Sequence, residues 1–184
     1  MAVPEAAQGI TAVVVTYNPD PEQLARLCQA VQPQVEHVVL VDNGSSAETL
    51  AALQALVEGP SSALTLLAQG ENRGIGAAQN AGIAMARQHG SRYVLLLDHD
   101  SIPEADMVAT LRAAIEDQPA GSPPVAAAGP RYADARQTTN PSPFVQLEGF
   151  KRVRCECQHA GQLIEVEHLI ASGSLIPMAV LDAV

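Results

Sequence analysis

The sequence has no tryptophan, and aromatic residues make up only 3% of its 184 positions. A hydrophobic core built from this composition has to consist of Val, Leu, Ile and Ala, the usual filling of layered α/β folds. The length is sufficient for one domain of ordinary size with a sizeable core.

Positive charge is also scarce, because 10 Lys and Arg residues stand against 20 Asp and Glu residues and give a net charge of −10. The longest basic cluster is the short KRVR at 151–154. This balance argues against nucleic acid or an anionic membrane surface as the main partner. No apolar run approaches 18 residues and no signal peptide opens the chain, so we expect no membrane-spanning segment.

Cysteine occurs three times. Cys28 falls on the apolar face of an expected helix, which predicts a core thiol. Cys155 and Cys157 form a C-x-C pair with His159 and His168 nearby. A zinc site usually needs a C-x₂₋₄-C spacing and more ligands. We therefore favour a reduced thiol pair on a strand of a cytoplasmic protein, with zinc as the alternative.

The first 130 residues alternate strands and helices. Near-continuous apolar runs, typical of parallel strands covered on both faces, predict strands at 10–17, 37–41, 63–68, 92–97 and 123–129. Apolar residues at helical spacing predict helices at 20–31, 45–57 and 74–90, and another after residue 101. Strand–helix repeats of this kind predict an α/β fold with an open, mostly parallel twisted sheet and helices on both faces.

Three of these helices carry sequence signals for their first residues. A capping box predicts each start: Asp20 with Gln23, Ser45 with Glu48, and Ser101 with Glu104. Pro21 also fits the first position of its helix.

The pattern of apolar and polar residues changes after residue 130. The segment 145–176 alternates more strongly, which predicts antiparallel strands around a turn at Ala160–Gly161. We therefore divide the chain into an α/β half, residues 1–130, and the start of a second subdomain, residues 131–184, which we expect to be incomplete at its C-terminal end.

Polar and glycine residues gather where four of the predicted strands end. These stretches read TYNP at 16–19, DNGS at 42–45, QGENRGIG at 69–76 and DHDS at 98–101. Ligands of open α/β sheets bind outside the carboxyl ends of the strands, where loops and helix N-termini converge. The sequence therefore predicts a single binding site at this edge of the sheet.

The fourth of these strand ends carries two acids. Residues i and i+2 of an extended segment point the same way, so Asp98 and Asp100 face one site. Two close carboxylates repel each other, and a divalent cation such as Mg²⁺ or Mn²⁺ removes that repulsion. The alternative is that Asp98 caps a helix and Asp100 is simply solvated.

The stretch GIGAAQ at 74–79 suggests a second alternative, because it is close to the glycine fingerprint of dinucleotide-binding folds. Gln79 occupies the third glycine position, however, and this strand–helix unit is the third rather than the first. A second acid at Asp100 also has no role in holding a ribose, so we disfavour this interpretation.

Together, VVVTYNP, VLVDNGS, ENRGIGAAQNAGI, YVLLLDHDS and LIASGSLIP resemble the inverting family 2 glycosyltransferases of the GT-A fold, across about residues 10–177. The resemblance is strongest to bacterial rhamnosyltransferases that use dTDP-L-rhamnose in polysaccharide assembly. Two positions depart from the common pattern: His99 stands where the family often has Gln, and Asn43 where many members have an acid.

The resemblance implies a nucleotide-sugar site formed by Thr16, Tyr17, Asn18, Asp42, Asn43, Asn72, Arg73, Gly74, Asp98, Ser172 and Gly173. Residues 16–18 would line the nucleotide base, which residues 42–43 would contact. Residues 72–74 would lie over the ribose and pyrophosphate, and residues 172–174 would border the donor sugar and the acceptor. Asp98 would contact the ribose or the metal's water shell, and Asp100 would bind Mg²⁺ or Mn²⁺ directly. Asn80 of the same motif would be a buried amide, with packing as the alternative role.

The implied reaction also needs a general base, which in this family is an acid beyond the acceptor segment. Glu165 and Glu167 precede that segment, and only Asp182 follows it. We therefore name no catalytic residue within the chain and expect the general base beyond Val184, the last residue of the sequence. The 184 residues would then be a fragment that binds the donor nucleotide but transfers little sugar.

The acceptor implied by the resemblance is a saccharide or a lipid-linked saccharide at the inner face of a membrane, reached from the cytoplasm by peripheral contact. The basic residues at 151–154 either attract a lipid diphosphate or, as we favour, form a solvated strand face. The alternatives for the function are a family member that uses a UDP-sugar and a nucleotide-binding module without catalysis. Apolar surface left bare by a missing C-terminal half would favour a homo-oligomer.

Overall fold

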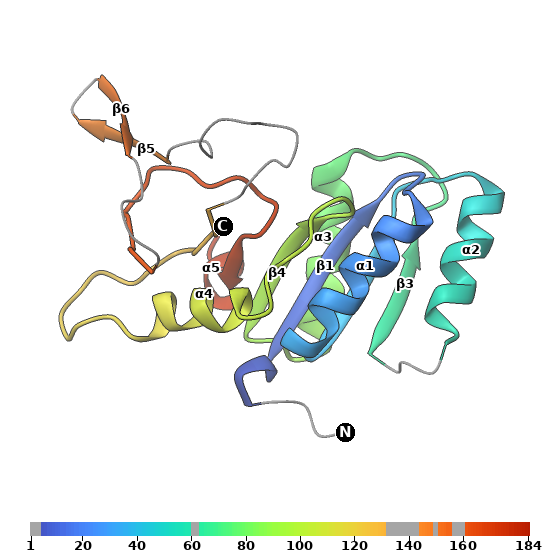
Figure 1. Cartoon of the computed structure of the whole chain (residues 1–184), viewed down its shortest axis with the longest axis horizontal. Helices are drawn as coiled ribbons and strands as arrows, with labels where there is room; N and C mark the ends of the chain where they lie inside the picture. The colour runs from blue at the N-terminus through green and yellow to red at the C-terminus, as the bar shows by residue number, and fades with distance from the viewer. Residues whose placement is uncertain (1–4, 60–62, 132–143, 149–150, 156–160) are drawn as a thin grey trace.

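The computed structural model describes residues 5–59, 63–131, 144–148, 151–155 and 161–184. Its main element is a five-stranded sheet in the order β3-β2-β1-β4-β7, accompanied by a two-stranded sheet of β5 and β6 (Figure 1). The first four strands of the main sheet are parallel: β1 (Ile10–Thr16), β2 (His37–Asp42), β3 (Leu64–Ala68) and β4 (Tyr93–Asp98). The short β7 (Leu175–Pro177) pairs antiparallel with β4. The predicted α/β fold is therefore confirmed.

Helices cover both faces of this sheet, as Figure 1 shows for α1 and α3. The helices are α1 (Pro21–Val31), α2 (Ala47–Val57), α3 (Ile75–Gln88), α4 (Met107–Glu116) and α5 (Met178–Leu181), with short 3₁₀ turns η1 (Glu5–Ala7) and η2 (Gln32–Gln34). Side chains of β1 alternate between the two cores, so that Val14 packs with α1, α2 and α4 while Val13 packs with α3 and α5. Among the described residues, no helix is long and apolar enough to cross a bilayer.

The helix α3 packs unusually close to the sheet because its sequence is rich in small residues. A Cβ atom added at Gly82 would lie 2.3 Å from Cγ1 of Val13, so only glycine fits there without movement. The helix α3 packs against both β1 and β2. Cys28 lies in the opposite core, where burial raises its pKa to about 11, in agreement with the predicted core thiol.

The predicted helix starts need correction. Asp20 does cap α1 by accepting a hydrogen bond from the Gln23 amide at 2.8 Å, but the Gln23 side chain turns elsewhere. The cap of α2 is Ser46 rather than Ser45. Ser101 does not cap α4, which begins later, at Met107.

Two predictions for the chain beyond residue 120 were wrong in part. Residues 123–129 form no strand and contribute only an isolated bridge between Ala128 and Leu175. The antiparallel pair does exist, as β5 (Phe144–Glu148) and β6 (Lys151–Cys155), but Glu148 pairs with Lys151. The strands therefore pair within 144–155 and not across Ala160–Gly161, of which Ala160 lies outside the described residues. Cys157 and His159 lie outside the described residues, as does the side chain of Cys155, so the interpretation of the C-x-C pair stays a prediction.

Candidate functional site

Three polar residues end adjacent parallel strands at one edge of the sheet. Thr16 is the last residue of β1, Asp42 of β2 and Asp98 of β4. In the strand register Thr16 lies beside Asp42, and Val15 lies beside Asp98. The structure thus brings together the strand ends that the sequence placed at a common site, along the upper edge of the sheet in Figure 1.

Asp42 lies beneath the loop that follows β2, with only 1% of its surface exposed. Its Oδ2 atom accepts hydrogen bonds from the amides of Gly44 at 3.2 Å and Ser45 at 3.1 Å. Its Oδ1 atom accepts from the hydroxyls of Ser45 and of Thr16, the latter at 3.3 Å. Donors to both oxygens compensate the buried negative charge, so this carboxylate holds the turn.

The loop after β1 is tied to the same turn through Asn18. The Asn18 amide donates to Oγ of Ser45 at 2.8 Å, and its Oδ1 accepts from the Ser46 amide at 2.9 Å. Asn18 has a φ of 44°, a left-handed conformation that asparagine tolerates better than most residues. The neighbouring Tyr17 side chain stays 49% exposed and available to a ligand.

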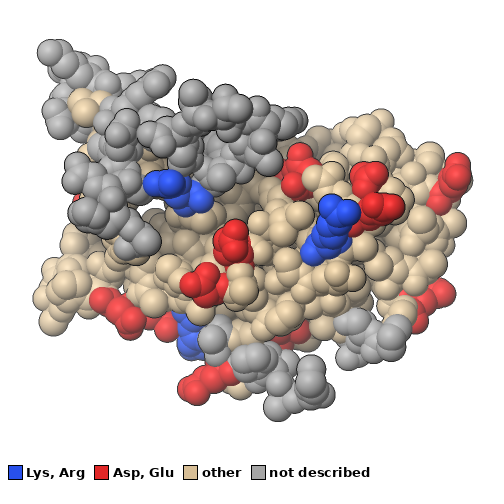
Figure 2. All heavy atoms as spheres, in the orientation of Figure 1, with Lys and Arg blue, Asp and Glu red and all other residues tan. Residues whose placement is uncertain are grey.

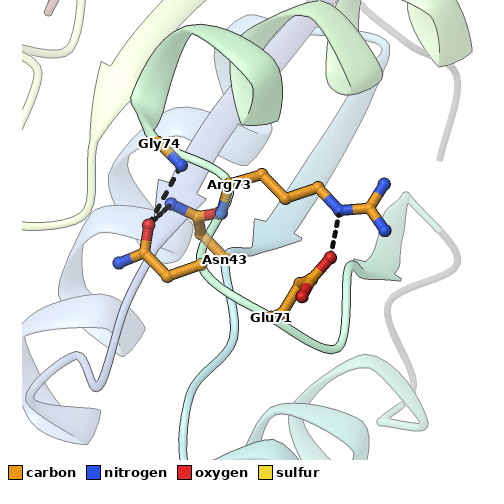
Figure 3. A network of polar contacts seen from close by, with 5 residues as sticks. Asn43, Glu71, Arg73 and Gly74 are labelled. Carbon is orange, nitrogen blue, oxygen red and sulfur yellow. Dashed lines mark hydrogen bonds and ion pairs between the residues drawn. The ribbon is translucent and has the colours of Figure 1, made fainter.

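Asn43 connects this turn to the loop between β3 and α3 (Figure 3). Its Oδ1 atom accepts from the Arg73 amide at 2.9 Å, and its Nδ2 donates to Oδ1 of Asn72 at 3.1 Å. The same Asn72 oxygen accepts from the Gly74 amide at 3.0 Å. Asn43 itself is 5% exposed, whereas Asn72, Arg73 and Gly74 are exposed, so one buried amide anchors an exposed loop.

The two loops also touch through their backbones. A Cβ atom at Gly44 would lie 2.5 Å from the carbonyl carbon of Glu71, and Gly44 has a φ of +87°. Both facts restrict this position to glycine. The DNGS motif therefore depends on its glycine for contact with the ENRG motif.

The Arg73 side chain extends away from Asn43 toward solvent, as Figure 3 shows. Its Nε atom lies 3.2 Å from Oε1 of Glu71, and both side chains are largely exposed. Exposed ion pairs contribute little to stability, so an anion of higher charge can displace Glu71.

The two acids after β4 have a different environment. Asp98 is half-buried and Asp100 is exposed. Burial raises the pKa of Asp98, and the negative charge of Asp100 raises it further, whereas His99 and a hydrogen bond with Ser172 oppose the rise. In the part of the chain that the structure describes, neither carboxylate forms an ion pair. The site therefore holds negative charge that the protein does not neutralise.

Two distant elements hold the loop that carries these acids. The Gln23 side chain of α1 donates to the Asp100 carbonyl at 3.1 Å. From the other side, the Asp98 amide donates to Oγ of Ser172 at 3.0 Å, and that hydroxyl lies 2.8 Å from Oγ of Ser101. Gln23 and Ser101 were predicted only as capping residues, and nothing in their local sequence signals these contacts.

Residues 172–174 lie directly beside the acid pair. The Gly173 amide donates to the Leu96 carbonyl at 2.7 Å, which fixes the segment to β4. The Ser174 hydroxyl points inward and donates to the Ile170 carbonyl at 2.6 Å. Asn80, which we expected to be a buried amide, is exposed on α3.

The last residues of the sequence contribute nothing to this site. Val184 follows α5 and is fully exposed. Its apolar side chain cannot transfer a proton, and we expect the general base beyond this residue. Asp182, the last acid before it, is bound by Arg87 through hydrogen bonds of 2.9 and 2.6 Å to its Oδ1 atom. No described residue tests the expectation of a base beyond Val184, which stays a prediction.

The donor set fits a divalent cation that takes part of its coordination from a ligand. Mg²⁺ and Mn²⁺ prefer oxygen donors and are often bound by one or two carboxylates together with water and phosphate oxygens. Asp98 and Asp100 supply two such carboxylates without a competing cation. Within the described residues no group of three or more His, Cys, Asp and Glu side chains could form a complete protein cage.

Acidic side chains are spread over the face of the molecule that carries α1 and α4, with few Lys or Arg side chains between them (Figure 2). A ligand with several negative charges therefore meets a repulsive surface except near Arg73 or near a bound cation.

Comparison with known proteins gives one family match. The model described as Glycosyl transferase family 2 matches residues 11–161. The protein named dTDP-rhamnosyl transferase RfbF, from Shigella flexneri, is 37% identical over 92 residues, which are 50% of this chain and 29% of that relative. The chain thus corresponds to less than a third of the relative's length.

Two solved structures share the fold. TarS 1-349 of S. aureus superposes over 95% of this chain and 48% of its own length, with a TM-score of 0.55 and 18% identity. The structure of GalNAc-T7 with UDP, GalNAc and Mn²⁺ covers 60% of this chain and 21% of its own length, with a TM-score of 0.54 and 20% identity. At these identities the likeness concerns the fold, which is that of GT-A glycosyltransferases.

Proposed function

This chain belongs to glycosyl transferase family 2, and on that premise we propose that it binds a nucleoside-diphosphate sugar at the carboxyl edge of its sheet for inverting transfer to an acceptor hydroxyl. The observation that carries the proposal is the placement, at that one edge, of an exposed arginine and of two carboxylates that form no ion pair within the described residues. A diphosphate needs positive charge to bind, and the acid pair supplies it only by holding a cation.

The donor we propose is dTDP-L-rhamnose. The support is the 37% identity, over half of this chain, to a protein named as a dTDP-rhamnosyl transferase. The site is formed by loops at the strand ends and by the segment before β7, with Asp42 and Asn43 as supporting residues: Thr16, Tyr17, Asn18, Asp42, Asn43, Asn72, Arg73, Gly74, Asp98, Asp100, Ser172 and Gly173. In this proposal the exposed Tyr17 lies against the base, and Arg73 leaves Glu71 to contact the pyrophosphate.

Asp98 and Asp100 are the residues that would hold Mg²⁺ or Mn²⁺. When bound, such a cation neutralises the diphosphate and stabilises it as a leaving group. Ser172 and Gln23 keep the acid loop in place, because each bonds to the backbone of one of the two acids.

We further propose that transfer requires a general base beyond Val184, outside the 184 residues of the sequence. Asp182 is the only acid after the 172–174 segment, and its carboxylate forms an ion pair with Arg87. The acceptor is a saccharide or lipid-linked saccharide of cell-surface polysaccharide synthesis, used at the cytoplasmic face of a membrane. The support for this acceptor is the family resemblance alone.

Calorimetric titration of the chain with dTDP and with UDP, each with and without Mn²⁺, tests the proposal. We expect dTDP to bind more tightly than UDP, and only weakly without Mn²⁺. Arg73→Gln should weaken dTDP binding about tenfold through loss of a charge-assisted hydrogen bond. Arg26→Gln removes an equally exposed arginine of α1 and should leave binding unchanged. Preference for UDP would reassign the donor, and absence of binding to either nucleotide would overturn the proposal.

A further inference from the structure

We propose that Asn43 is a positioning residue, whose buried amide clamps the β3–α3 loop and thereby presents Arg73 to the diphosphate. The effect of Asn43 on diphosphate binding rests on the proposed function, whereas its hydrogen bonds to the β3–α3 loop are a property of the free protein. An experiment can therefore contradict one of these two statements without the other.

The geometry of the clamp uses both ends of the Asn43 amide. One end accepts from the Arg73 backbone at 2.9 Å, and the other donates to Asn72 at 3.1 Å. The Asn72 side-chain oxygen also accepts a hydrogen bond from the Gly74 amide. The buried Asn43 side chain therefore fixes three consecutive residues of the loop, directly or through Asn72 (Figure 3). With 5% of its surface exposed, Asn43 has little area left with which to contact a ligand itself.

Arg73 depends on this clamp because its other restraint is weak. Among the described residues its guanidinium contacts an exposed carboxylate, Glu71, and that contact has to break when a phosphate binds. The partly buried hydrogen bond that its backbone amide donates to Asn43 is then what fixes the origin of the side chain. Asn43 thus acts through Arg73 and contacts no reacting group.

The chemistry requires an amide at position 43 but not at position 72. Asn43 donates one hydrogen bond and accepts another, whereas Asn72 only accepts, from Asn43 and Gly74. An ionised carboxylate accepts but cannot donate. Asn43→Asp therefore breaks the network. Asn72 has to turn its own amide nitrogen toward the new carboxylate, and its side-chain oxygen then no longer accepts the hydrogen bond from the Gly74 amide. Asn72→Asp preserves all three hydrogen bonds.

The two variants form a matched pair, since each adds one negative charge to the same cluster. Amide hydrogen exchange of the free protein at pH 7.5 should show Gly74 protection reduced at least tenfold in Asn43→Asp and kept in Asn72→Asp. Lowering the pH to 5 should restore protection in Asn43→Asp, because a protonated carboxyl carries one donor and one acceptor. Burial and the neighbouring charge of Asp42 favour that protonation by raising the pKa of an aspartate at position 43, whereas the hydrogen bond from the Arg73 amide opposes it.

Affinity for dTDP with Mn²⁺ is the second readout. At pH 7.5 the Asn43→Asp variant should bind dTDP at least tenfold more weakly than wild type. At pH 5 the dissociation constants of the variant and of wild type should become nearly equal. A loss of the same size at both pH values, or Gly74 protection equal to wild type, would overturn the proposal. Should Asn43→Asp fail to fold, Asn43→Ser in the wild-type background is the alternative test. Hydrogen exchange at the Arg73 and Gly74 amides should then be faster than in wild type, and unchanged exchange would contradict the proposed role of Asn43. If the clamp is confirmed but wild type binds no nucleotide, only the proposed function fails.

Discussion

Asp42 and Asp98 end the two strands that flank β1, and their surroundings are opposite. Asp42 is almost fully buried, yet two backbone amides and two hydroxyls compensate its charge. Asp98 is more accessible, but burial and the charge of Asp100 raise its pKa. A buried acid with a full set of donors shapes the structure, and a less buried acid beside another acid is prepared for a cation. The comparison distinguishes the two roles where the sequence shows only an aspartate at a strand end.

The largest effect is expected from Asp42→Ala. The substitution leaves the half-buried amides of Gly44 and Ser45 and the buried Thr16 hydroxyl without their carboxylate acceptor, and an unpaired buried donor costs about 1–3 kcal/mol. The free energy of unfolding in urea should fall by roughly 3 kcal/mol. The matched change Asp98→Ala should lower it by less than about 1 kcal/mol. Equal losses in the two variants would contradict the distinction.

A smaller effect is expected from Ser172→Ala. The variant removes the hydroxyl that accepts from the Asp98 amide, which should cost about 1 kcal/mol in urea unfolding. The Gln23 side chain and the His99 ring, whose Nδ1 lies 3.4 Å from the Val15 carbonyl, still hold the acid loop. Without the Ser172 contact, however, the free energy of Mn²⁺ binding with dTDP should fall by more than the free energy of unfolding does. The neighbouring Ser174→Ala, whose hydroxyl bonds to Ile170, should affect stability without a specific loss of metal binding.

The smallest effect concerns pH. The pKa of Asp98 is higher in the folded chain than in the unfolded one, so the native state holds this proton more tightly. The resulting stability is present below about pH 4, the ordinary pKa of an aspartate, and is lost as the pH rises through the raised value. Relative to Asp98→Asn, the wild type should therefore lose stability as the pH increases over this interval. Asp100→Asn should narrow this pH interval, because the charge of Asp100 is one cause of the raised pKa of Asp98. Plots of stability against pH that do not change with this substitution would contradict the proposed cause.

Much of the fold could be predicted from the sequence because buried parallel strands are continuous apolar runs. The run at 10–17 became Ile10–Thr16, and convergence of the strand ends followed from parallel topology. The run at 123–129 failed as a strand because the edge of β4 is occupied by Leu175–Pro177, an equally apolar but much shorter segment. Which segment takes that edge is a matter of tertiary packing that local propensity does not express.

The contacts that hold the site could not be predicted, because they join residues distant in sequence. Ser45 and Ser46 are equally good caps, and Ser46 takes the role because the Ser45 hydroxyl bonds to Asp42. Gln23 looked like half of a capping box, but its partner is the Asp100 carbonyl, 77 positions away. The residue types at the strand ends were therefore informative, whereas the division between supporting and ligand-facing residues required the structure.

Asp98 and Asp100 are central to the proposed function, because they would bind a divalent cation beneath the diphosphate. Titration with Mn²⁺ in the presence of dTDP, followed by electron paramagnetic resonance of the free ion, measures this binding directly. We expect one Mn²⁺ per wild-type chain, at least tenfold weaker binding in Asp98→Asn and in Asp100→Asn, and wild-type affinity in Asp106→Asn, an exposed acid of the same loop. Wild-type affinity in both acid-pair variants would contradict the account.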